Sequence, residues 1–101
     1  MFYPVWKYTV KEATKSEFEE EYGRQGTWFK LFEKTDNYMG LELLHSHTAS
    51  QQYILIDRWT SREDYESFTT ENREENDALS KRFSYLIENE ENDGTFNLLL
   101  P

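Results

Sequence analysis

The sequence predicts an α+β protein of the ferredoxin-like class, a four-stranded antiparallel sheet with helices on one face. Two observations lead to this prediction. Segments with the composition of strands and segments with helical spacing follow one another in the order strand, helix, strand, strand, helix, strand (βαββαβ). In addition, the third of these strands carries apolar residues on both faces, which indicates a strand in the interior of an assembly.

The central hairpin is predicted from two neighbouring runs. Residues 52–59 are rich in β-branched and aromatic residues, and the polar residues 48–51 connect them to a strand-like run at 39–47. Strand alternation places Tyr53, Leu55, Asp57 and Trp59 on one face and Ile54, Ile56 and Arg58 on the other. Helices on one side can cover only one of these faces. We therefore expect a homodimer in which the other sheet face meets a second copy through a two-fold interface.

The first half of the chain supplies a strand and a helix. Residues 2–10 have the pattern of a first strand, and the capping-box spacings of Thr14 with Glu17 and of Ser16 with Glu19 predict a helix at about residues 15–22. Gly23 is expected to end this helix in a left-handed conformation.

The segment after this helix is short and apolar. Residues 24–34 predict a helical turn or short helix packed onto the sheet. The polar residues 35–37 predict a turn, and Gly40 indicates a bulge or a close backbone approach in the second strand.

The second half begins with another capped helix. Either Thr60 or Ser61 can begin it. Residues 71–77 are almost wholly polar and predict a break in the helix or a solvated face, with a lid over a pocket as the alternative. Residues 88–94 read as an acidic connection, and residues 95–100 as the final strand.

Composition limits the classes of function. A chain of 101 residues predicts one domain, residues 1–101. The net charge of -9 argues against binding to nucleic acids and anionic membranes, which attract Lys and Arg. Without an apolar run of about 20 residues or a basic leader followed by an apolar segment, the cytoplasm is the expected location. The absence of cysteine leaves chemistry to His, Tyr, Trp and carboxylates, or to a borrowed cofactor.

The candidate catalytic residues are few. His45 and His47 are the only histidines, share one strand face, and could act as a base near neutral pH. A metal site could begin with this pair, although no third ligand is evident, and hydrogen-bonded or solvent-facing histidines are the other alternative. Arg58 could orient a substrate oxygen, with a structural ion pair as the alternative.

Aromatic residues supply the candidate substrate-binding wall. Aromatic rings stack on planar ligands, and plain hydrophobic core is the alternative role for the same residues. Asp57 shares a strand face with Trp59 and could be a buried carboxyl with a raised pKa. The predicted wall consists of Trp28, Tyr53, Asp57, Trp59, Tyr65 and Phe68.

Several segments carry a resemblance to a known family. They are residues 28–32, 38–44 and 53–59, followed by Ser61, Tyr65 and Phe68, and finally residues 91–94 with Phe96. Over nearly its whole length the chain resembles the antibiotic biosynthesis monooxygenase family of dimeric α+β barrels. The barrel also occurs in relatives with unrelated reactions, so these segments are more specific for fold than for chemistry.

The resemblance implies oxidation of a small quinol- or anthrone-like aromatic by molecular oxygen, without metal, flavin or other cofactor. His45 or His47 would be the base and Arg58 the oxyanion donor. The chain has Phe68 where many quinol-oxidising relatives carry a helix His, and Phe68 and Ala78 where haem-degrading relatives carry Trp and His. It also lacks their Asn on the first strand. The alternative function is a non-catalytic homodimer that binds a small hydrophobic or aromatic ligand.

Overall fold

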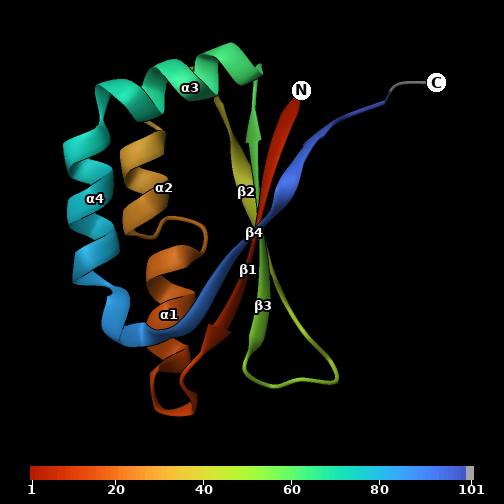
Figure 1. Ribbon diagram of the computed structural model, residues 1–101, viewed down its shortest axis with the longest axis vertical. Coiled ribbons are helices and arrows are strands. Elements are labelled where there is room, and N and C mark those ends of the chain that lie inside the picture. The colour runs from red at the N-terminus through yellow and green to blue at the C-terminus, as the bar shows by residue number, and fades with distance from the viewer. Residues whose placement is uncertain (100–101) are drawn as a thin grey trace.

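The structure is a computed structural model that describes residues 1–99. Its strands and helices follow the predicted order, with a short 3₁₀ turn before the first helix and another before the last strand (Figure 1). The elements are β1 (Phe2–Val10), η1 (Glu12–Thr14), α1 (Lys15–Tyr22), α2 (Thr27–Phe32), β2 (Tyr38–His45), β3 (Gln52–Trp59), α3 (Arg62–Glu71), α4 (Arg73–Arg82), η2 (Ser84–Leu86) and β4 (Ile87–Asn97). Within the described chain, no helix is long and apolar enough to cross a membrane.

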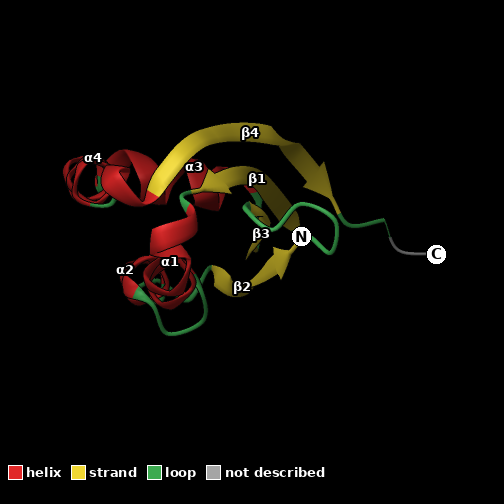
Figure 2. Cartoon of the chain, turned by 90° about the horizontal axis from the view of Figure 1, so that it is seen from below, coloured by secondary structure: helices red, strands yellow, loops and turns green. Residues whose placement is uncertain are grey.

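The four strands form one antiparallel sheet in the order β2-β3-β1-β4. Leu41 of β2 is paired with Asp57 of β3, and Tyr53 of β3 is paired with Tyr8 of β1. The helices lie on one side of this sheet, as Figures 1 and 2 both show. The predicted ferredoxin-like arrangement is therefore confirmed.

The first helix begins and ends where the sequence predicts, but the details at its ends differ. The Thr14 hydroxyl does not cap the helix, because it donates to the carbonyl oxygens of Lys11 and Leu86 at 3.2 and 3.0 Å. Gly23 has a φ of -87° and is extended rather than left-handed. A Cβ atom at Gly23 would lie 2.6 Å from the Glu19 carbonyl oxygen, so glycine permits a close backbone approach there.

The break predicted in the second helical segment lies at Asn72, between α3 and α4. The Asn72 backbone N–H and side-chain amide both donate to the Phe68 carbonyl oxygen, at 3.0 and 2.9 Å. The chain turns sharply at this point (Figure 1). At the start of α3, Ser61 rather than Thr60 is the cap, since its hydroxyl oxygen accepts from the Asp64 backbone N–H at 3.1 Å.

The last strand is longer than predicted. Residues 88–94, expected to be a connection, belong to β4, which ends at Asn97. Among the described strands it pairs with β1 alone, and most of its side chains are exposed, so an edge position tolerates the acidic sequence. The turn signal near Gly94, whose φ is 115°, marks a shift in the β1–β4 register. Of the predicted strand 95–100, Leu100 lies outside the described residues.

The core lies between the sheet and the helices. Trp59 is fully buried there, with its ring centroid 5.4 Å from that of Phe68 and 5.6 Å from that of Phe32. The opposite sheet face has no covering element from the described chain (Figure 2). On this outer face Ile54 and Ile56 are only partly buried. The sheet thus separates an aromatic core from an outer face that the described chain leaves uncovered.

Candidate active site

A cavity of about 170 Å³ lies in the core between the sheet and the helices. Aromatic side chains form most of its wall, and polar groups enter it from β3, β4, α3 and α4. The lining residues are Trp6, Tyr8, Tyr22, Trp28, Phe32, Leu41, Leu55, Asp57, Tyr65, Thr69, Asn76, Ser80 and Glu90. Among these described residues there is no Lys, Arg or His.

Asp57 is the most deeply buried acid of the cavity, with 4% of its surface exposed. It is on β3, and alternation along this strand directs it toward the helices. Burial raises the pKa of Asp57 to about 7, although the hydrogen bond that the Tyr38 hydroxyl donates to Oδ1 at 3.1 Å opposes the shift. A carboxyl of this pKa can accept or release a proton near neutral pH.

Glu90 on β4 is the second acid of the cavity, and it is exposed to solvent. Partial burial of its carboxyl raises the pKa of Glu90, while a long hydrogen bond from the Tyr8 hydroxyl, at 3.5 Å, acts in the opposite direction. Burial also raises the pKa of Tyr8, and the charge of Glu90 adds to that effect. The cavity therefore has a deep carboxyl at Asp57 and a solvent-facing carboxyl at Glu90.

Two polar atoms of the lining residues have no hydrogen-bond partner within the described chain. They are Trp28 Nε1 and Asn76 Oδ1, and both are buried. The pKa of Tyr22 is raised by burial, and the nearby Trp28 indole offsets part of that rise without reaching hydrogen-bond geometry. Buried polar groups without partners are uncommon in native proteins, so Trp28 and Asn76 are available to a ligand.

The histidines lie away from the cavity. Both are exposed, His45 at the end of β2 and His47 in the loop that follows it. The His45 ring stacks on Tyr53 with a centroid distance of 4.4 Å, and its Nε2 is 2.7 Å from the Ser50 carbonyl oxygen. Neither histidine lines the cavity. In residues 1–99, no three His, Asp or Glu side chains come together in a group that could hold a metal.

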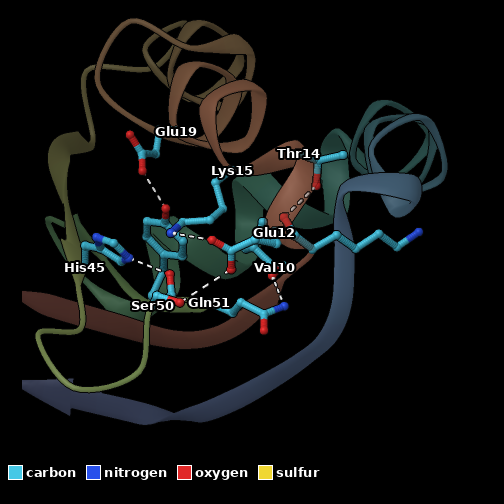
Figure 3. Close-up of polar contacts among 10 residues, drawn as sticks. Val10, Glu12, Thr14, Lys15, Glu19, His45, Ser50 and Gln51 are labelled. Carbon is cyan, nitrogen blue, oxygen red and sulfur yellow. Dashed lines mark hydrogen bonds and ion pairs between the residues drawn. The ribbon is translucent and has the colours of Figure 1, made fainter.

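Polar contacts around His45 join the β2–β3 hairpin to the start of the first helical segment (Figure 3). The Tyr53 hydroxyl donates to Glu19 at 2.5 Å, and the Ser50 hydroxyl donates to Glu12 at 3.4 Å. Lys15 forms an ion pair with Glu12 at 3.4 Å. The contacts of Tyr53 and Ser50 therefore join the hairpin to the first helical segment, whereas His45 contacts only residues of the hairpin.

Arg58 lies on the outer sheet face, opposite the cavity, as strand alternation requires. Its Nε is buried without a hydrogen-bond partner, and within residues 1–99 it forms no ion pair. Gly40 faces it across the strand pair with a φ of 106°, and a Cβ atom there would be 3.1 Å from Arg58 Nη2. The bulge expected at Gly40 is present as a register shift, and it makes room for the guanidinium group.

The predicted wall residues divide into two groups. Trp28, Asp57 and Tyr65 line the cavity. Tyr53, Trp59 and Phe68 are buried in the surrounding aromatic core and do not line it.

Several residues of the cavity lining were not predicted from the sequence. Glu90 lies among other polar residues, so the sequence around it lacks the alternation of apolar and polar residues that predicts a strand. Asn76 and Ser80 are four residues apart, so their shared helix face was a usable signal for polar groups directed at one place. A similar spacing relates Tyr65 and Thr69 on α3.

Comparisons with known proteins agree on the fold. No protein-family model matches the sequence, and no curated protein does. A solved structure from Bordetella bronchiseptica, provisionally named an antibiotic biosynthesis monooxygenase, is 16% identical, has a TM-score of 0.78, and covers 98% of this chain and 97% of its own. A similarly named structure from Nitrosomonas europaea is 14% identical, has a TM-score of 0.70, and covers 99% of this chain and 100% of its own.

A third solved structure is a mutant of SnoaB, a cofactor-independent oxygenase from Streptomyces nogalater. It is 17% identical, has a TM-score of 0.68, and covers 99% of this chain and 94% of its own. At these identities the likeness shows the fold. The chain has the fold of the antibiotic biosynthesis monooxygenases, as its sequence predicts.

Proposed function

We propose that this chain is a cofactor-independent monooxygenase that oxidises a small phenol or hydroquinone with molecular oxygen. The observation that carries the proposal is the buried Asp57 carboxyl in an aromatic cavity, with a pKa of about 7. The fold shared with a cofactor-independent oxygenase agrees with this function.

The size of the cavity limits the substrate. A cavity of about 150 Å³ accommodates a benzene molecule, whereas sites for drug-sized ligands are roughly 300–1,000 Å³. The cavity measures about 170 Å³ and therefore suits one aromatic ring with small substituents. This volume is smaller than that of the anthrone-like substrate that the sequence resemblance implies.

Asp57 would be the general base. A phenol has a pKa of about 10, so transfer of its proton to a carboxylate of pKa about 7 costs about 4 kcal/mol. Hydrogen bonds to the phenolate oxygen can lower this cost, and the unpaired Trp28 N–H is a donor in the lining. The Tyr38 hydroxyl would hold the Asp57 carboxyl in place while the proton moves.

The substrate itself would supply the electrons for oxygen. A hydroquinone and one O₂ would give a hydroxyquinone and one water. One oxygen atom enters the ring and the other leaves as water, so the substrate provides all four electrons that reduce O₂. Aromatic walls would shield the carbanion-like phenolate and the oxygenated intermediate from water.

The second candidate function is a non-catalytic protein that binds a small aromatic ligand. The absence of histidine from the described cavity lining favours it, because the base expected from sequence is missing there. In both functions the outer sheet face would form a homodimer. The exposed apolar residues Met39, Leu44 and Phe96 support this assembly, with exposed fractions of 46%, 47% and 53%.

The test is oxygen uptake by the purified protein with single-ring hydroquinones that differ in ring substitution. Asp57→Asn should lower the rate at least about 100-fold, a typical contribution of a general base. His47→Ala, which alters an exposed loop residue outside the cavity, should keep the wild-type rate. Heat-denatured protein measures the uncatalysed background.

Two results would reject the monooxygenase. One is oxygen uptake no faster than background for hydroquinones whose binding is established by titration, which would favour the ligand-binding protein. The other is an unchanged rate in Asp57→Asn, provided that the variant shows a normal unfolding transition. Loss of activity in His47→Ala would instead identify a histidine-dependent reaction.

A further inference from the structure

The cavity has two carboxyl groups and an aromatic wall, but its described lining has no basic side chain. From this arrangement we propose that the substrate is a single-ring phenol that carries a protonated amine, with the phenol at Asp57 and the ammonium group at Glu90. The inference rests on the proposed function, because it assigns a substrate class to the same cavity.

The negative charge of the cavity lining argues against an anionic substrate. Its two ionisable acids are Asp57 and Glu90, and the whole chain carries a net charge of -9. A carboxylate or phosphate on the substrate would meet these groups without a compensating cation from the described lining. A cationic group on the substrate would instead stabilise both carboxylates by charge attraction.

The two acids occupy separate parts of the cavity. Asp57 is on β3 and Glu90 is on β4, with β1 between these strands. Ile56 is paired with Val5, so Asp57 is level with Pro4, whereas Glu90 is paired with Tyr8, four residues further along β1. Strand geometry therefore separates the two backbone positions by roughly 10 Å across the sheet and roughly 13 Å along it. One elongated ligand can approach both side chains as they extend into the cavity.

The solvent-facing end has the surroundings that a cation requires. Tyr8 is opposite Glu90, and the Tyr8 and Tyr22 rings meet edge to face with centroids 5.3 Å apart. Trp6 also lines the cavity and is paired with Asn92 of β4, two residues beyond Glu90. Aromatic faces attract ammonium groups, and a carboxylate beside them adds a charge-assisted hydrogen bond. An anchored amine would leave the phenol at the deep end, beside Asp57.

Three single-ring phenols with different side-chain charges test this inference by calorimetric titration. Tyramine carries an ammonium group, 4-ethylphenol is neutral, and 3-(4-hydroxyphenyl)propionate carries a carboxylate. Tyramine should bind at least about tenfold more tightly than 4-ethylphenol, and the propionate should bind most weakly. Glu90→Gln should remove most of the tyramine advantage and leave 4-ethylphenol binding unchanged.

Glu91→Gln is the matched control, since it makes the same charge change one residue along β4. Glu91 is paired with Lys7, and its side chain lies on the outer sheet face rather than in the cavity. This variant should keep the wild-type preference for tyramine. Because both glutamates are exposed, neither substitution should alter the unfolding transition.

Equal affinity for tyramine and 4-ethylphenol would overturn the inference, as would failure of all three phenols to bind. An equal loss of the tyramine advantage in Glu90→Gln and Glu91→Gln would also overturn it, because long-range charge would then explain the preference. The proposed function fails separately. A Glu90-dependent preference for tyramine, without oxygen uptake from tyramine or from any hydroquinone that binds by titration, would support amine binding and reject the monooxygenase.

Discussion

Asp57 and Arg58 are neighbours in the chain, yet they lie on opposite faces of the sheet. Asp57 is buried against the helices with one hydrogen bond, from Tyr38. Arg58 is on the outer face, where a guanidinium nitrogen is buried without a partner. Because side chains alternate along β3, the Asp57 carboxylate and the Arg58 guanidinium group cannot pair, although the two residues are adjacent in the sequence. Burial of the carboxyl raises the pKa of Asp57, and the hydrogen bond from Tyr38 opposes that rise.

The two sheet faces also differ in how their apolar surface is covered. The inner face packs on the helices and encloses the cavity, whereas the outer face has no cover from the described chain (Figure 2). The inner face therefore suits chemistry that needs a carboxyl group shielded from water. Assembly is the role that the outer face can serve.

The largest predicted effect concerns stability and the Asp57 charge. The pKa of Asp57 is about 7 when folded, against an ordinary value near 4, so its stabilising contribution is present below about pH 4 and is lost as pH rises through 7. Asp57→Asn removes this titration and can still accept the Tyr38 hydrogen bond. The free energy of unfolding of the variant relative to wild type should rise by about 4 kcal/mol between about pH 4 and pH 9.

Denaturant unfolding at several pH values measures this difference. Asp77→Asn is the control, because Asp77 is an exposed residue of α4 outside the cavity and should show little pH-dependent difference from wild type. A flat difference between Asp57→Asn and wild type would show that Asp57 titrates at its ordinary pKa. The buried carboxyl would then not be the neutral-pH base of the proposal.

The next prediction concerns the outer face. Ile56→Lys places a charge in the middle of the proposed dimer interface, and it does so once in each copy. The dimer dissociation constant should rise at least about 100-fold, since a buried unpaired charge opposes association. Light scattering across a concentration series measures the change, with Ala78→Lys, at an exposed residue of α4 on the helix side of the sheet, as the control for an added positive charge. A wild-type protein that is monomeric at micromolar concentration would contradict the assembly itself.

The strand and helix order could be predicted because its signals are local. Residues 52–59 are rich in β-branched and aromatic residues, which favours a strand, and the structure has β3 at these residues. Capping-box spacing likewise predicted α1, and the polar residues 71–77 predicted the break at Asn72. Each signal depends on residues a few positions apart, so a single sequence contains it.

The site was harder to predict because it depends on contacts across the sheet. Asp57 and the aromatic residues Trp28 and Tyr65 were identified from strand facing and ring chemistry. Glu90 was missed, since only pairing with β1 turns its acidic segment into a strand. The histidines were selected by their chemistry, but His45 lies at the end of β2 and His47 in the loop that follows, and both are exposed.

The smallest predicted effect concerns the hydroxyl that faces Asp57. Tyr38→Phe keeps the ring and removes the donor whose hydrogen bond to Asp57 holds the pKa below the value that burial alone would produce. The pKa of Asp57 should therefore rise by about one unit at most, which moves the acidic limb of the pH–rate profile to higher pH, because the base must be deprotonated to act. Tyr65→Phe is the matched comparison, because Tyr65 lines the cavity without a hydrogen bond to Asp57, and it should shift that limb less. Carbon-13 NMR of the Asp57 carboxyl measures the same pKa without turnover. A lower pKa of Asp57 in Tyr38→Phe than in the wild type would mean that the Tyr38 hydroxyl does not stabilise the charged carboxylate.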